Sequence, residues 1–159
     1  MSATIRPGRR ADVATIAELI RGLARYEGLE AEVTMTDERL ESALFGPRPY
    51  AETLIAELEG QAVGFALFFH SFSTFLAQPG IYLEDLFVVE SHRGQGIGRS
   101  LLAKLAEIAV ERECGRLEWS VLDWNTDAIG FYESLGARPN SGWTMYRLVG
   151  DALTTLARE

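Results

Sequence analysis

The sequence is poor in cysteine and histidine and has no long apolar run. Its one cysteine, Cys114, excludes an internal disulfide and any cysteine-based zinc site, so no metal is expected. The longest apolar stretch, Val63 to Phe69, has the length of a strand and is too short to cross a membrane. The first residues also lack the apolar core of a signal peptide, and we therefore expect a cytoplasmic protein with no membrane partner.

Basic residues are the scarcer charged type. Fifteen Lys and Arg stand against 23 Asp and Glu, which gives a net charge of −8. This balance argues against nucleic acid as a partner, because phosphates attract a basic face. It is compatible with a cationic substrate, although many proteins are acidic for solubility alone. The length, and the lack of repeats or linker-like stretches, predict a single domain over residues 1–159.

Hydrophobic periodicity predicts both helices and strands. The predicted helices are Ala11 to Tyr26, Thr36 to Phe45, Ile97 to Arg112, Thr126 to Leu135 and a short one over Asp151 to Arg158. The predicted strands are Thr4 to Arg6, Thr53 to Leu58, Ala62 to Phe69, Ile81 to Val89, Arg116 to Leu122 and Thr144 to Val149, with a loop over Ser71 to Gly80. Hairpins and strand–helix–strand units occur together, which predicts a mixed α/β sheet with helices on both faces.

A glycine-rich turn runs from Arg93 to Ser100, between a predicted strand and a predicted helix. Glycines let a ligand approach the backbone amides, and the first turn of a helix has unpaired N–H groups that suit a phosphate. Arg93 and Arg99 add cationic donors. A P-loop or a dinucleotide fingerprint starting at Gly94 would need a glycine where Arg99 stands. The pattern that fits is Arg-x-x-Gly-x-Gly, which predicts a pyrophosphate site.

Four segments in order resemble the GNAT acetyltransferases, and most closely their diamine/thialysine (spermidine/spermine-like) branch. They are Ile81 to Val89, the glycine-rich turn, Leu117 to Asn125 and Ala128 to Ala137. The resemblance extends from about Ile5 to Leu148. It implies the GNAT fold, a single mixed and mostly antiparallel twisted sheet of about seven strands. It also implies acetyl-CoA as the acetyl donor and a homodimer.

The resemblance assigns roles to individual residues. Those matched to cofactor binding are Leu86, Phe87, Val88, Arg93, Gly94, Gln95, Gly96, Ile97, Gly98, Arg99, Asn125 and Tyr132. Tyr132 matches the tyrosine beside the cofactor sulfur, where it would protonate the leaving thiolate. Glu84 matches the acidic residue that helps to deprotonate the amine. Without the resemblance, Tyr132 reads as a core residue.

The chemistry explains why an acidic residue is needed. An alkylamine has a pKa of about 10, so about 0.1% is neutral at pH 7, and recovering the neutral form costs roughly 4 kcal/mol. A carboxylate such as Glu84 can take that proton if partial burial raises its pKa. Asp85 is adjacent in the same strand and should point to the opposite face. A strand amide near Phe87 can stabilise the oxyanion if a bulge breaks the pairing there.

The acceptor amine stays open between a small diamine and a lysine analogue. Polyamine-specific relatives resemble Asp-x-Trp where this chain has Ser73-x-Phe75, which resembles the thialysine type instead. We therefore take Ser73, Phe75, Glu84 and Asp85 as candidate substrate contacts. Glu27 is a further candidate, with a solvated helix end as its alternative.

Two other functions compete with a small-molecule acetyltransferase. A protein lysine or N-terminal acetyltransferase would need an open groove, which the Ser71–Gly80 and Gly28–Thr36 loops should narrow. A non-catalytic acyl-CoA-binding module would be expected to lose Tyr132 or Glu84, and both are present.

Overall fold

The structure is a computed structural model, and it describes residues 2–159. The chain divides into two units, Met1–Ser120 and Val121–Glu159. The first unit contains the sheet and three of the α-helices, and the second contains α4 (Thr126–Ser134) and α5 (Gly150–Leu156). The single domain expected from the sequence stays a prediction.

The sheet is mixed and mostly antiparallel, as predicted. Its strands are β1 (Thr4–Pro7), β2 (Glu52–Leu58), β3 (Gln61–Ser73), β4 (Gln78–Val88) and β5 (Leu117–Trp119), and they lie in that order. Only β5 is parallel to its neighbour. The expectation of about seven strands is wrong, since five form within residues 2–159. The predicted strand over Thr144 to Val149 does not form, and β5 is shorter than expected.

The helices of the first unit begin and end close to the predicted positions. They are α1 (Val13–Glu27), α2 (Asp37–Phe45) and α3 (Ile97–Glu111). The hydroxyl of Thr36 accepts a hydrogen bond from the N–H of Arg39, which caps α2 as expected. Gly28 ends α1 with a left-handed φ of 71°.

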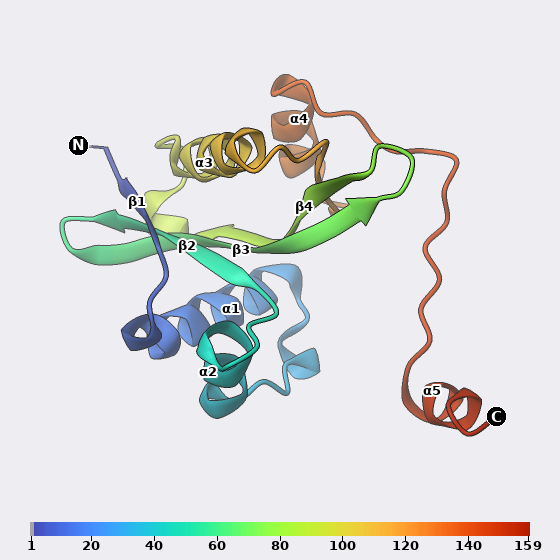
Figure 1. Cartoon of the computed structure of the whole chain (residues 1–159). Helices are drawn as coiled ribbons and strands as arrows, with labels where there is room; N and C mark the ends of the chain where they lie inside the picture. Colours follow the sequence, from blue (N-terminus) through green and yellow to red (C-terminus); the bar gives the residue numbers. More distant parts are fainter. Residues whose placement is uncertain (1) are drawn as a thin grey trace. The chain divides into compact units, whose positions relative to one another are not determined.

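Two helical layers enclose the sheet of the first unit. Figure 1 shows α1 and α2 on one face and α3 on the other. One core lies between the sheet and the pair α1 and α2. Its buried residues are Val13, Ile16, Ala17, Leu19, Leu40, Leu44, Ile55, Phe65 and Phe87. On the other face, α3 buries Leu101 and Leu105 completely. These layers confirm a sheet with helices on both faces.

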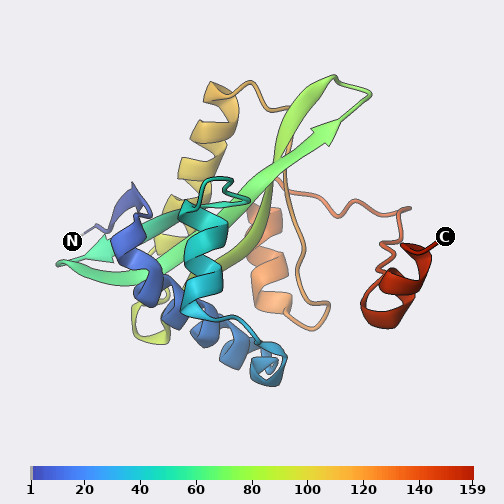
Figure 2. The same cartoon turned by 60° about the horizontal axis from the view of Figure 1, so that its bottom comes forward.

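The long loop predicted over Ser71 to Gly80 is wrong. Those residues continue β3 and β4 as a hairpin, with Ser71 paired to Gly80 and Ser73 to Gln78. The Ser, Pro and Gly residues that suggested a loop are therefore accommodated in an antiparallel ladder. The end of this hairpin projects beyond the helices of the first unit (Figures 1 and 2).

Candidate active site

A β-bulge interrupts β4 at Glu84. Phe68 pairs with Leu83, but the preceding residue of β3, Leu67, pairs with Asp85. Glu84 is therefore an extra residue without a partner on β3, and the alternation of faces restarts after it. A strand amide near Phe87 was expected to stabilise the oxyanion if the pairing were broken there, and the break lies three residues earlier. The expectation that Glu84 and Asp85 point to opposite faces assumed an unbroken strand, so alternation along β4 no longer supports it.

Asp85 lies on the sheet face that α1 and α2 cover. It is paired with Leu67, which packs against the core on that face, and paired residues share a face. Asp85 is half-buried. Burial, together with the charges of Glu84 and Glu27, raises the pKa of Asp85 to about 6. A carboxylate with such a pKa is a better base near neutral pH than an ordinary aspartate.

Two further carboxylates act on Asp85. Glu27 is the last residue of α1, and burial raises its pKa. Glu84 is exposed, so the partial burial predicted for it is wrong. Both charges act on Asp85 strongly enough to raise its pKa. The three candidate substrate contacts Glu27, Glu84 and Asp85 thus form one acidic group.

The segment of β4 after Leu83 has an open edge within the first unit. β5 pairs with β4 only from Ile81 to Leu83. Beyond that point, no strand among residues 2–120 pairs with this side of Leu86, Phe87 and Val88. These are the residues whose backbone was expected to hold the acyl arm. An unpaired strand edge offers N–H and C=O groups to an extended ligand.

The glycine-rich turn presents its backbone amides without internal partners. Within residues 2–159, the N–H groups of residues 94–99 donate to no protein acceptor, whereas the N–H of Ser100 bonds to the carbonyl of Gly96. Gly94 and Gly96 have φ angles of 77° and 80°, and no atom lies within 4 Å of where a Cβ would stand. This cradle of amides at the start of α3 fits a pyrophosphate.

Arg93 is engaged by the protein itself. Its Nε donates to the carbonyl oxygen of Val88 at 2.9 Å, and its guanidinium lies 4.5 Å from the centre of the Tyr26 ring. The centre of the Phe87 ring lies 5.5 Å from the same guanidinium. Arg93 therefore holds the turn against β4 and the end of α1. The sequence had indicated only a phosphate contact, and no pattern in it predicted the stacking on Tyr26.

Asn125 and Tyr132 belong to the second unit. The side-chain oxygen of Asn125 accepts from the N–H of Ala128 at 3.3 Å and caps α4. Tyr132 lies on α4 beside Phe131, with 5.6 Å between the ring centres. Their predicted contacts with the cofactor stay predictions.

Ser73 and Phe75 differ in their surroundings. The hydroxyl of Ser73 accepts from the N–H of Leu76 and lines a hollow at the end of the hairpin. Phe75 is 98% exposed in the hairpin turn and does not line it. The same hollow is lined by Arg116 and Glu118, which the sequence analysis did not single out. Their spacing of two along a predicted strand was the available signal.

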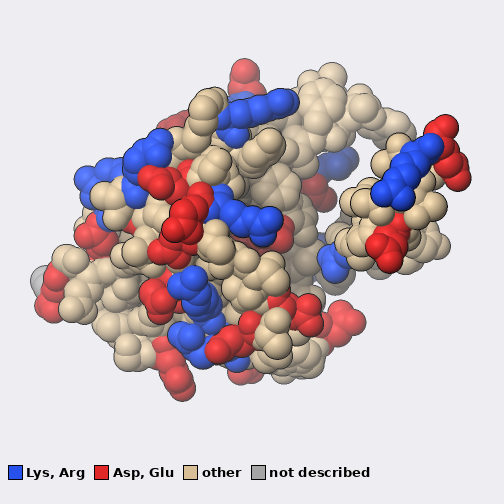
Figure 3. Space-filling view, turned by 90° about the horizontal axis from the view of Figure 1, so that it is seen from below, with Lys and Arg blue, Asp and Glu red and all other residues tan. Residues whose placement is uncertain are grey.

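The outer surface of α1 and α2 mixes charges of both signs. Figure 3 shows Lys and Arg interspersed with Asp and Glu on this face. Three ion pairs account for part of the pattern, namely Arg10–Glu41, Arg21–Glu18 and Arg25–Glu30. This face is therefore not a basic surface of the kind that binds nucleic acid.

Neither a metal centre nor a membrane helix is found in the described part of the chain. Among residues 2–159, no three His, Cys, Asp or Glu side chains gather in a way that would hold a metal ion. No helix there combines the length and the apolar character that crossing a bilayer requires.

The comparisons with known proteins agree with this geometry. The model of the acetyltransferase (GNAT) family matches residues 16–137, which include β4, the glycine-rich turn and α4. The chain belongs to the GNAT acetyltransferase family. It is 39% identical to the thialysine N-epsilon-acetyltransferase of Bos taurus, over 96% of each chain. It is 32% identical to the L-ornithine N5-acetyltransferase of Arabidopsis thaliana, over 98% of this chain and 88% of that one.

A solved structure has the same fold as this chain. An integron cassette protein from the mobile metagenome of V. cholerae superposes with a TM-score of 0.83 at 29% identity. The match covers 100% of this chain and 99% of the other. The family uses acetyl-CoA as its acetyl donor, which agrees with the open edge of β4 and the amide cradle of this GNAT chain.

Proposed function

We propose that this protein is an acetyl-CoA-dependent N-acetyltransferase that acetylates a primary amine of a small molecule by direct attack within a ternary complex. The observation that carries the proposal is Asp85, a half-buried carboxylate with a raised pKa close to the open edge of β4. Relatives named for thialysine and ornithine acetylation support a diamine, a polyamine or a lysine-like amino acid as acceptor.

The amides of residues 94–99 would hold the pyrophosphate, with Arg99 as a nearby cation. Their lack of internal partners and the open space at Gly94 and Gly96 support this role. Arg93 would act mainly by holding the turn, because its guanidinium is already bonded and stacked. The backbone of Leu86, Phe87 and Val88 would bind the acyl arm along the open edge.

Asp85 would take the proton from the bound ammonium, directly or through water. An alkylamine has a pKa of about 10. The pKa of Asp85, about 6, is closer to that value than the pKa of an ordinary carboxylate, so the proton transfer is less unfavourable. Glu27 and Glu84 would hold the cation beforehand. Glu84 remains the alternative base, since the sequence resemblance favours it.

Tyr132 would protonate the departing thiolate, and Asn125 would contact the cofactor arm. The match of α4 to the GNAT family supports both assignments. The chemistry needs a proton donor because CoA leaves more readily when its sulfur is protonated as the C–S bond breaks.

The assembly would be a homodimer in the cytoplasm, with no nucleic acid or membrane partner. Large apolar side chains exposed on the C-terminal segment support association with a second copy. They are Trp143, Met145, Tyr146, Leu148, Val149, Leu153 and Leu156. A chain with one free cysteine suits a reducing compartment.

An amine panel with acetyl-CoA, read by the release of CoA thiol, tests the proposed function. We expect turnover with diamines or lysine-like amino acids and none with a peptide that carries only an internal lysine. Turnover of the peptide alone would favour a protein acetyltransferase. Binding of acetyl-CoA without turnover of any amine would favour a non-catalytic module.

A further inference from the structure

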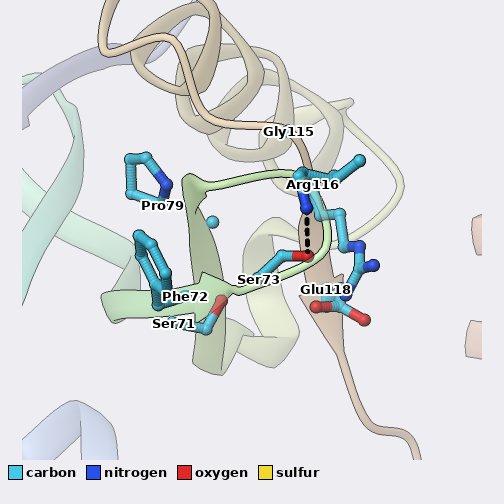
Figure 4. A pocket seen from close by; sticks show the side chains of 9 residues that line it. Ser71, Phe72, Ser73, Pro79, Gly115, Arg116 and Glu118 are labelled. Atoms are coloured by element: carbon cyan, nitrogen blue, oxygen red, sulfur yellow. Dashed lines mark hydrogen bonds between the residues drawn. The ribbon is translucent and has the colours of Figure 1, made fainter.

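A hollow of about 50 Å³ lies at the projecting end of the β3–β4 hairpin, next to the start of β5. Two hydroxyl side chains, Ser71 and Ser73, come from the hairpin, and two charged side chains, Arg116 and Glu118, come from the β5 side (Figure 4). Polar groups of three kinds thus converge on one small space: hydroxyls, a guanidinium and a carboxylate.

The two charges are close together but not paired. Arg116 directly precedes β5 and Glu118 lies within it, and both side chains line the hollow. Figure 4 shows both side chains on the same side of the hollow. Among residues 2–159, neither side chain makes an ion pair, with the other or with any other residue. A cation and an anion are therefore both available to a ligand.

The hollow shares a sheet face with Asp85. Ser71, Ser73 and Leu67 are separated by even numbers of residues along β3, so they lie on one face, and Leu67 is paired with Asp85. Glu118 is paired with Tyr82, which is itself paired with Phe69 on that same face. One continuous face therefore leads from the hollow to the acidic group.

We propose that the hollow binds the α-carboxylate and α-ammonium of an amino acid whose side-chain amine is the acetyl acceptor. The inference rests on the proposed function and narrows its substrate class. Arg116 presents a planar fork that can bind a carboxylate through two hydrogen bonds. Glu118 accepts hydrogen bonds from the ammonium, and Ser71 lies beside both groups.

The distances along the sheet suit a lysine-like side chain. Ser71, which lines the hollow, is four residues along β3 from Leu67, the partner of Asp85, a separation of about 13 Å at about 3.3 Å per residue. A four-carbon stem with a hydrogen bond of about 2.9 Å at each end spans this separation. The side-chain amine then reaches Asp85 while the amino-acid group occupies the hollow.

Matched pairs of acceptors test the assignment. L-lysine and 1,5-diaminopentane differ only in the α-carboxylate. We expect the wild-type protein to have a higher kcat/KM for lysine. We expect Arg116→Met to lower kcat/KM for lysine by roughly 10- to 100-fold, mainly through KM, because a charge-assisted pair is lost. The rate with 1,5-diaminopentane should not change. Arg48→Met is the matched control, since Arg48 is exposed and does not line the hollow.

Two results would overturn the inference while leaving the acetyltransferase intact. One is a wild-type protein whose kcat/KM for 1,5-diaminopentane equals its kcat/KM for lysine. The other is an equal loss on both acceptors in Arg116→Met. If neither acceptor is acetylated, the proposed function fails. Calorimetry with lysine then tests separately whether the hollow binds an amino acid. Lysine binding that Arg116→Met abolishes would support the site, and binding that persists would reject it.

Discussion

Ionised Asp85 destabilises the folded chain, because burial and the charges of Glu84 and Glu27 raise its pKa from 3.8 to about 6. A carboxyl group with a raised folded-state pKa binds its proton more tightly when folded. Its destabilising effect is absent below pH 3.8, grows between the two pKa values and is complete above pH 6. The full effect is up to about 3 kcal/mol.

Replacing Asp85 should therefore stabilise the protein at neutral pH. We expect Asp85→Asn to raise the Tm by several degrees at pH 8, and the gain should shrink as the pH falls below 6. The change in Tm is measured by thermal unfolding, followed by circular dichroism, from about pH 4.5 to about pH 8, a range that includes the shifted pKa of Asp85. Glu84→Gln should give a smaller gain, because Glu84 is exposed and supplies only one of the charges that raise the pKa of Asp85. A gain in Tm that does not depend on pH would contradict the electrostatic origin.

The same two variants identify the base. Loss of a general base lowers the rate by roughly 10²- to 10⁴-fold, and the loss should diminish as the pH approaches the amine's own pKa of about 10. We expect this pattern for Asp85→Asn in steady-state acetylation assays. If Glu84→Gln shows the recovery at high pH and Asp85→Asn does not, the base is Glu84, as the sequence resemblance predicts.

Tyr132 is tested by removing its hydroxyl alone. Tyr132→Phe should lower kcat by about 10²- to 10⁴-fold with little change in the Kd for acetyl-CoA, because the ring still packs. Phe131→Leu is a useful comparison, since it alters the neighbouring ring without removing a proton donor. A Tyr132→Phe variant with the wild-type kcat would exclude Tyr132 as the acid.

At the scale of elements, the sequence predicted what depends on local pattern. The periodicity of Ile97 to Glu111 and the cap at Thr36 are local, and α2 and α3 form where expected. The bulge at Glu84 is not local, because it depends on which residue of β3 each residue of β4 meets. The same holds for residues 71–80, whose turn-forming composition suggested a loop until pairing with the opposite strand made them a hairpin.

The glycine-rich turn allows a test with a matched control. Gly96→Val should weaken acetyl-CoA binding by at least about 10-fold, because a β-branched residue resists a φ of 80° and blocks approach to the amides. Gly60 in the β2–β3 hairpin has a φ of 79° and equally open surroundings. Gly60→Val should therefore lower the Tm similarly but leave calorimetric acetyl-CoA binding unchanged. Equal losses of affinity in both variants would indicate general unfolding.

At the scale of the whole molecule, the C-terminal segment departs most from the sequence prediction. Residues 144–149 have the apolar and β-branched composition of a strand, yet within residues 2–159 they pair with no other segment. A strand needs a partner to satisfy its backbone groups, and a single sequence cannot say whether that partner lies in the same chain. The candidate site could not be fully predicted from the sequence for a similar reason, because the raised pKa of Asp85 depends on Glu27, which is far from it in the sequence.

A second copy of the chain is the partner we expect for this segment. Trp143 and Tyr146 are 81% and 94% exposed, and burying such a side chain stabilises by about 1.5–3 kcal/mol. Exchange of a terminal segment between two copies buries it in both and closes the assembly with two-fold symmetry. Light scattering should give twice the 17.6 kDa of one chain for the wild type and the single mass for Trp143→Asp combined with Tyr146→Asp. Val110→Asp is the control, since Val110 is 77% exposed on α3 and should leave the dimer intact. If the wild-type protein has the mass of a monomer at micromolar concentration, the C-terminal segment does not bind a second copy of the chain.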